Sequence, residues 1–148
     1  MNKIIFKNKP DLSTPISAEI LNLLQDNVEN AINGTTLYNS STGTVQNVTL
    51  SQSVANFNSI EIYYARRKSD GTYEHSSKRI DTPNGKTVNL DMVRFSSSAT
   101  MQVAAKQIKI SGTSITVVGY DSVNITSNNA MSGYSNSDSI YIMKVVGY

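Results

Sequence analysis

Two patterns of hydrophobic and polar positions meet near Gly34. In the first, apolar residues recur at spacings of three and four, the period of one helix face. These positions are Leu21, Leu24, Val28 and Ala31, widened by Ile20 and Ile32. Thr14 suits the N-cap, Pro15 suits the first helical position, and the Asn33-Gly34 step is a stop signal. The pattern predicts a helix of about 18 residues, from Pro15 to Ile32.

The apolar stripe on this helix has two interpretations. In one, it packs against the domain that follows in the same chain. In the other, it forms a seam of two heptads that pairs with copies of itself. A seam of that length is marginal in isolation, so self-association would need help from the following domain. Periodicity alone leaves both interpretations open.

After Gly34 the pattern changes to alternation, which is typical of β-strands. It is clearest at 59–65, where Ile60, Ile62 and Tyr64 face one way and Glu61 and Tyr63 the other. Further strands are expected at 44–50, 73–80, 86–90, 100–110, 114–120 and 139–148, with a short edge at 121–127 and a loop at 128–137.

Turn signals separate these strands. Asp70-Gly71 favours a tight hairpin between 59–65 and 73–80, and further turns are expected at 82–85 and 111–113. The parity of apolar positions changes between Ala105 and Ile108, which predicts a bulge or a bend. The chain is therefore expected to be mainly β: an antiparallel sandwich or jelly-roll-like head (35–148) behind a lead-in and one short helix (1–34). A strand reaching Tyr148 implies that the C-terminus lies within a sheet.

Charge and composition exclude several classes of protein. The net charge is +2, from 13 basic and 11 acidic residues, too little to indicate nucleic-acid binding. There is no cysteine for a disulfide or thiolate site, and His75 has no spaced cluster of metal ligands. No segment approaches the roughly 20 apolar residues of a membrane span. The start lacks the long apolar stretch of a signal peptide, so we expect synthesis in a cytoplasm without the usual leader.

No catalytic constellation is present, so we expect no enzyme activity and no cofactor. The common nucleophile, phosphate-loop and zinc-protease motifs are all missing. Glu74 and Ser76 would point away from His75 across a strand, which removes a local triad. The few carboxylates lie beside turns, without sign of the acid–base pair that a glycan-degrading enzyme needs.

One basic run, Arg66-Arg67-Lys68, lies among tyrosines at the expected hairpin. It is either a solvated hairpin tip or a patch for an anionic polymer such as a phosphorylated glycan, because guanidinium groups match phosphate geometry and tyrosine rings offer stacking planes. The candidate receptor-binding residues are Tyr63, Tyr64, Arg66, Arg67, Tyr73 and His75.

The N-terminal segment Asp11–Asn22 resembles the Thr-Pro-Ile-x-Ala-Glu-x-Leu-Asn stretch found near the start of phage and prophage tail-fibre or baseplate proteins of low-GC Gram-positive bacteria. A β-rich head follows it there, as it does in this chain. Further similar features are Gly43-Thr44-Val45, Leu50-Ser51, the strand from Phe57 to Tyr64, Pro83-Asn84-Gly85-Lys86 and the closing Lys144–Tyr148.

This resemblance implies a homotrimeric receptor-binding protein of the virion, with partners in the tail or baseplate and a saccharide of the host cell wall as ligand. It favours the self-associating helix, with Ile20, Leu21, Leu24, Val28 and Ala31 in the seam. The alternative is a structural baseplate or tail-tip adaptor that contacts no receptor. A glycan-degrading enzyme is the third alternative.

Overall fold

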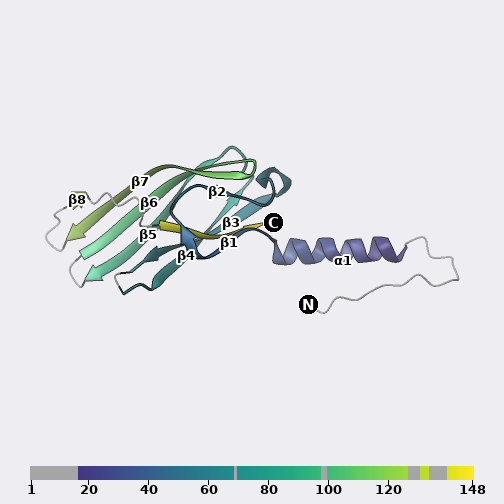
Figure 1. Ribbon diagram of the computed structural model, residues 1–148, viewed down its shortest axis with the longest axis horizontal. Coiled ribbons are helices and arrows are strands. Elements are labelled where there is room, and N and C mark those ends of the chain that lie inside the picture. Colours follow the sequence, from purple (N-terminus) through teal and green to yellow (C-terminus); the bar gives the residue numbers. More distant parts are fainter. Residues whose placement is uncertain (1–16, 69, 98–99, 127–130, 134–139) are drawn as a thin grey trace. The chain divides into compact units, whose positions relative to one another are not determined.

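The β-rich fold with one short helix near the N-terminus is confirmed (Figure 1). The computed structural model describes residues 17–68, 70–97, 100–126, 131–133 and 140–148. The chain divides into two compact units, Met1–Thr35 with Tyr148 and Thr36–Gly147. This division lies beside the boundary expected after Gly34, while the attachment role expected for the first part stays a prediction.

The helix α1 (Ala18–Asn33) has 16 residues and begins later than expected. Ser17 is its N-cap: its Oγ accepts a hydrogen bond from the Ile20 amide at 3.3 Å, and its carbonyl accepts one from the Leu21 amide at 3.2 Å. Ser17 therefore takes the role expected of Thr14, which lies with Pro15 outside the described residues. Gly34 ends the helix with a φ of 69°, a left-handed conformation that glycine adopts without steric cost.

The β unit contains two sheets. Its strands are β1 (Thr35–Thr44), β2 (Val48–Thr49), β3 (Ser59–Arg67), β4 (Tyr73–Asp81), β5 (Thr87–Ser97), β6 (Thr100–Ser111), β7 (Ser114–Thr126), β8 (Met131–Gly133) and β9 (Ile140–Gly147), with one 3-10 turn, η1 (Val54–Asn56), before β3. Sheet A has the order β1-β9-β3-β4. Sheet B has the order β2-β7-β6-β5, and β8 pairs with β7. Strand β1 was missed from the sequence, where only 44–50 was expected to be extended.

Sheet A contains both the first strand of the β unit, β1, and the last, β9, as direct neighbours. The expected β3–β4 hairpin is confirmed, with Arg67 opposite Tyr73. The C-terminal strand β9 lies between β1 and β3, so the expected strand at the C-terminal end is confirmed, although it stops at Gly147 and does not include Tyr148. In Figure 1 this yellow strand lies among the blue strands of early sequence. Its pairing with β3 shifts by one residue after Tyr63, which leaves Met143 as a bulge.

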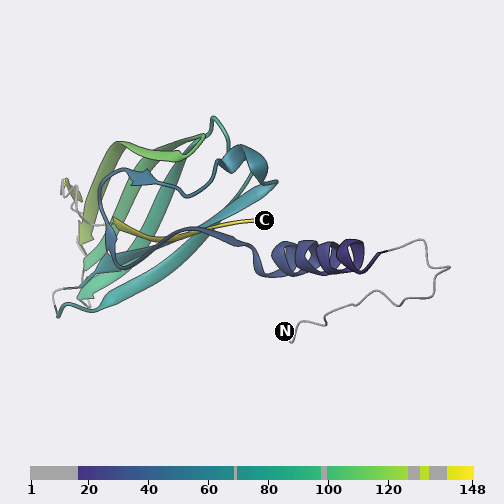
Figure 2. The same cartoon turned by 45° about the vertical axis from the view of Figure 1, so that its right-hand side comes forward.

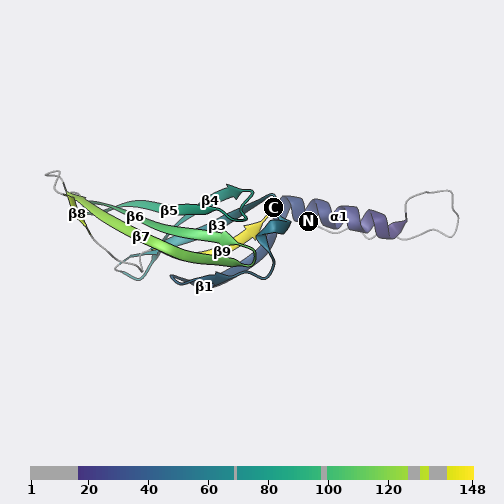
Figure 3. The same cartoon turned by 90° about the horizontal axis from the view of Figure 1, so that it is seen from above.

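Sheet B is a meander of the consecutive strands β5, β6 and β7, which form one curved layer when seen from above (Figure 3). A bulge or a bend was expected between Ala105 and Ile108 of β6, and the pairing of β6 with β7 is irregular at this place, with the extra residue in β7. Gln107 pairs with Gly119 and Ile108 pairs with Val117, so Val118 is the extra residue. The β5–β6 register stays regular through this region. The parity change in β6 therefore reflects apolar residues on both faces of the strand.

The core lies between the two sheets, which Figure 2 shows as two layers. It is built mainly from inward-facing aliphatic side chains: Ile60, Ile62, Leu90, Ile108, Ile110, Ile115, Ile142 and Val145, all fully buried. Each such side chain contributes about 1.5–3 kcal/mol when it leaves water. Lys106 is also buried, and its Nζ donates a hydrogen bond to the Val45 carbonyl at 2.9 Å.

Candidate functional site

Three strands bring aromatic and charged side chains onto the outer face of sheet A. Across β3 and β4, Arg67 lies opposite Tyr73 and Ala65 lies opposite His75. On the other flank of β3, Ala65 lies opposite Tyr141 of β9. Directly opposed residues of antiparallel strands point to the same side of a sheet. Since Tyr64, the neighbour of Ala65, points into the core, these five side chains share the outer face.

Tyr73 is the centre of a ring cluster on this face. Its ring centroid lies 5.8 Å from that of Tyr141, edge to face at 83°, and 6.2 Å from that of His75. Its hydroxyl donates a hydrogen bond to the Thr42 carbonyl in β1 at 3.3 Å. Ala65 lies between His75 and Tyr141 and is fully buried, which is consistent with rings covering it. Contacts with Tyr141, His75 and the Thr42 carbonyl therefore hold the Tyr73 ring in place.

Polar and cationic groups border these rings. The Lys144 Nζ lies 5.8 Å from the centroid of the Tyr63 ring, within cation–π range. The Tyr63 hydroxyl donates a hydrogen bond to Glu61 at 3.0 Å, and Ser77 Oγ donates one to the same carboxylate at 2.7 Å. Arg67 is exposed. We call the group Tyr63, Tyr73, His75 and Tyr141 the aromatic surface.

Two of the six candidate receptor-binding residues lie elsewhere. Tyr64 and Arg66 are only 4% and 5% exposed, because they occupy every second position after Ile60 and Ile62 and so share the inner face of β3. Tyr64 crosses the interlayer space and donates a hydrogen bond to the Asp91 carbonyl at 3.1 Å. Both residues are therefore excluded from the candidate surface. The other four, Tyr63, Arg67, Tyr73 and His75, lie together on the outer face of sheet A.

Tyr141 and Lys144 were missed from the sequence. They lie at least 60 residues after the hairpin, and only the insertion of β9 beside β3 brings them to Tyr73 and Tyr63. A partial signal was present. Ile140 and Ile142 alternate with Tyr141, which indicates that this ring faces away from the core.

Hydrogen bonds in the β3–β4 loop help to fix the register of β3 against β4, and so the positions of Arg67 and Tyr73 on this face. Lys68 donates from its amide to the Thr72 carbonyl at 2.7 Å, and Gly71 has a φ of 86°. Asp70 accepts hydrogen bonds from the Thr72 hydroxyl at 2.6 Å and from the Thr72 amide at 2.9 Å. These hydrogen bonds hold the pKa of the exposed Asp70 carboxyl below its ordinary value of 3.8, and the bond from the Thr72 hydroxyl has a larger effect than the bond from the Thr72 amide.

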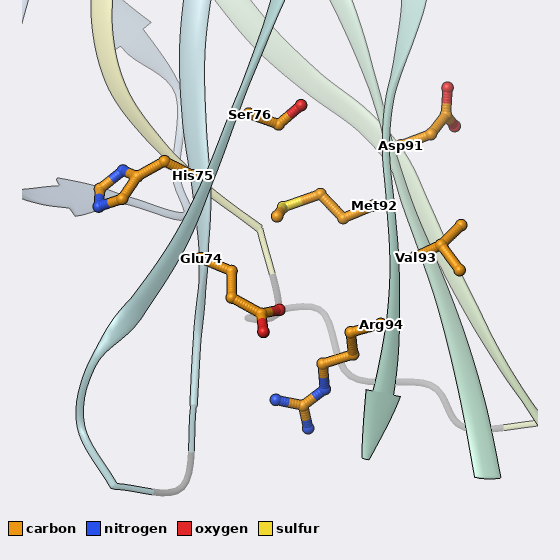
Figure 4. Close-up of a pocket in the computed structure, with 7 residues that line it drawn as sticks. All are labelled: Glu74, His75, Ser76, Asp91, Met92, Val93 and Arg94. Atoms are coloured by element: carbon orange, nitrogen blue, oxygen red, sulfur yellow. The ribbon is translucent and has the colours of Figure 1, made fainter. Parts of the chain in front are cut away.

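A pocket of about 300 Å³ lies between the edge strands β4 and β5 (Figure 4). Glu74, Ser76, Met92 and Arg94 point into the space between the strands, while His75 points away from it. His75 thus belongs to the aromatic surface on the opposite face of β4. As expected from strand alternation, Glu74 and Ser76 lie on the other side of the strand from this histidine.

The helix, considered by itself, carries an apolar stripe. Ile20, Leu24 and Val28 are 48–53% exposed, and Leu21 is half-buried. Ala31 belongs to α1, but its side chain lies outside the described residues. Leu23, which was not included in the expected stripe, is also exposed. Self-association through this stripe stays a prediction.

Neither metal-binding clusters nor membrane helices occur in the part of the chain that the structure describes. Its His, Asp and Glu side chains form no group of three or more that could hold a metal ion. Its one α-helix has neither the length nor the hydrophobicity to cross a membrane. No protein-family model matches the chain, and no curated protein matches it in sequence.

Proposed function

We propose that this chain is the receptor-binding head of a phage or prophage tail and that it binds a saccharide of the host cell wall without catalysis. The aromatic surface is the observation that supports this most. Sugar rings stack their C–H faces on aromatic side chains, and their hydroxyls exchange hydrogen bonds with polar neighbours. Tyr73, Tyr141 and His75 offer the rings, and Glu61 and Lys144 offer an acceptor and a cation beside them.

In this proposal the chain is made in the host cytoplasm, joins the virion and acts as a homotrimer. The exposed stripe of Ile20, Leu24 and Val28 supports self-association, because its burial between copies removes apolar surface from water. Three linked sites gain avidity of about 10²–10⁴-fold over one weak site when they bind together. Other tail or baseplate proteins are the expected partners of the N-terminal part.

Binding of fluorescently labelled protein to whole Gram-positive cells tests the receptor role. Saturable binding should disappear when the wall polysaccharide is removed. Tyr73→Ala and Tyr141→Ala should each weaken it by about fivefold or more, since loss of a stacked ring costs about 1–3 kcal/mol by analogy with base stacking. Lys109→Ala, an exposed change on the outer face of sheet B, is the matched control. Unchanged binding by both tyrosine variants would refute the assignment of this surface.

The trimer is tested separately by sedimentation equilibrium. Leu24→Asp combined with Val28→Asp should dissociate the oligomer, because the charges would be buried in the seam. Asn22→Asp, on the polar face of the same helix, should leave it intact. A wild-type chain that is monomeric at micromolar concentration would contradict the homotrimer.

A structural baseplate or tail-tip adaptor is the second candidate, and the outer face of sheet B favours it. Val93 is 60% exposed there, opposite Val103, and Met101 lies opposite Ile125 on the same face. Exposed apolar faces of this kind are typical of contacts between proteins. An adaptor would bind tail proteins and leave whole cells unlabelled, so the cell-binding experiment separates the two functions.

A further inference from the structure

The pocket between β4 and β5 lies at an open edge of the sandwich, and its lining residues are of the types that bind small ligands. Glu74 and Ser76 enter it from β4, and Met92 and Arg94 enter it from β5 (Figure 4). A carboxylate, a hydroxyl and a guanidinium thus converge on a space of about 300 Å³. This volume is at the lower end of the range for small-molecule sites.

Neighbouring side chains hold the two charged groups of the pocket in place. Lys68 Nζ lies 3.2 Å from a Glu74 carboxylate oxygen. Arg94 donates from Nε to the Gln102 side-chain carbonyl at 2.7 Å. Among the ion pairs of the described residues, Glu74 pairs with Lys68 and not with Arg94. The acceptor and the donor therefore face the same space without neutralising each other.

The walls of the pocket are tied together across the two sheets. Lys78 of β4 donates from Nζ to the Asn89 carbonyl of β5 at 2.6 Å and pairs with Asp91 at 3.6 Å. The Tyr64 hydroxyl reaches the Asp91 carbonyl from β3. Met92, which is 9% exposed, adds an apolar side chain between these polar groups. Such links keep the spacing of β4 and β5 set before any ligand binds.

We propose that this pocket binds one neutral saccharide unit through two adjacent hydroxyl groups. A sugar hydroxyl both donates and accepts, so one hydroxyl can donate to Glu74 while its neighbour accepts from the Arg94 terminal amines. Met92 offers an apolar contact for the C–H face of the ring. This inference rests on the proposed saccharide binding and adds a second subsite to it, because β4 carries His75 on one face and Glu74 on the other.

Titration of the full-length, isotope-labelled chain, monitored by amide NMR, tests the subsite. The probes are glucose, galactose, rhamnose and N-acetylglucosamine, each taken to millimolar concentration. At least one should shift the amides of 74–76 and 92–94 in a saturable way. Arg94→Lys keeps the charge and loses the planar pair of donors, so it should weaken that binding about tenfold or more. Glu74→Gln should weaken it to a similar extent.

Lys109→Gln is the matched control. It removes a charge from an exposed side chain on the outer face of sheet B, and Lys109 does not line the pocket. The variant should keep sugar affinity within about twofold. If Lys109→Gln lowers the affinity as much as Glu74→Gln does, the effect is not specific to the pocket and the inference is wrong.

The result that overturns the inference is specific to this pocket. If no probe shifts 74–76 and 92–94, or if Arg94→Lys and Glu74→Gln change the melting temperature and leave the titration unchanged, these charges only protect the sandwich edge. Cell binding that still depends on Tyr73 and Tyr141 would then leave the proposed function standing. If the wild-type protein does not bind cells at all, the proposed function itself is rejected.

Discussion

The outer faces of the two sheets differ in chemistry and in construction. Sheet A presents the aromatic surface beside Lys144, Arg67 and Glu61, whereas sheet B presents aliphatic side chains such as Val93 and Val103 at one part of its outer face and polar ones such as Lys109 at another. The long strands β5, β6 and β7 of sheet B follow one another in sequence, joined only by the two-residue strand β2 from an earlier part of the chain, whereas sheet A brings the C-terminal strand between β1 and β3. The surface with the richer chemistry is therefore the one that depends on contacts between distant parts of the chain.

This difference has a physical reason. A meander pairs each strand with its neighbour after a short loop, so little chain entropy opposes the contact. Insertion of β9 closes a loop of more than 70 residues between β3 and β9. It buries Ile140, Ile142 and Val145 completely, and this apolar burial offsets the entropy. The aromatic surface thus exists only when the whole β unit is folded.

Deletion of residues 140–148 should have the largest effect. Sheet A would lose a central strand and three fully buried side chains. Each such side chain contributes about 1.5–3 kcal/mol, so their loss is comparable to the whole stability of a typical domain, about 5–15 kcal/mol, and the backbone hydrogen bonds of β9 to β1 and β3 are lost as well. We expect no cooperative thermal unfolding transition by circular dichroism. A truncated chain that still unfolds cooperatively would show that sheet A does not need β9.

Replacement of one alanine on each outer face by leucine compares the packing of the two faces directly. Ala65→Leu should lower the free energy of unfolding by about 1–3 kcal/mol, since Ala65 is fully buried between His75 and Tyr141. Ala105→Leu, on the outer face of sheet B, should stay within about 0.5 kcal/mol of the wild type because Ala105 is only half-buried. Urea titration measures both. Equal effects would mean that the two faces are packed alike.

Val93→Thr tests whether the face of sheet B is solvent-exposed or a protein contact. Thr keeps the β-branch, so we expect a change in unfolding free energy within about 0.5 kcal/mol. In the receptor-binding proposal the sedimentation coefficient also stays unchanged, since the helix holds the oligomer together. A smaller oligomer for Val93→Thr would place this face in a subunit contact and would favour the adaptor function.

The smallest expected effect concerns Asp70 in the β3–β4 loop. Its pKa is lowered in the folded protein, so its contribution to stability is fully present above the ordinary carboxyl pKa of 3.8. The contribution is lost as the pH falls below that value through the lowered folded pKa. Asp70→Asn keeps an acceptor for the Thr72 amide and should remove this acid-side slope, measured by urea unfolding between pH 5 and 2 relative to wild type. An unchanged slope would contradict the assignment.

Local patterns predicted much of this fold correctly. Alternation at Ile60, Ile62 and Tyr64 predicted their burial, and the Asp70-Gly71 step predicted the β3–β4 hairpin. The prediction was less exact where apolar residues occur on both faces of a strand. The apolar residues of β6 predicted a bulge or a bend between Ala105 and Ile108, and the irregularity is at Gln107 and Ile108, but the extra residue is Val118 of β7. Sequence spacing cannot separate a bulge from a strand that is apolar on both sides.

The candidate surface was predicted only in part. Tyr63, Arg67, Tyr73 and His75 share a face because strand alternation and a short hairpin are local properties of the chain. The same alternation excludes Tyr64 and Arg66, which were chosen for residue type and nearness to the hairpin. Parity within a single strand was therefore a better guide to the surface than aromatic and basic composition.

By itself the sequence determined the local elements: the helix before Gly34, the strands with clear alternation and the turns that need glycine. These depend on backbone sterics and on side chains a few residues apart. Only the tertiary structure decided that Tyr141 lies against Tyr73 and Lys144 over Tyr63. Those contacts depend on which distant strand pairs with β3, a choice made by burial of apolar side chains across the whole β unit.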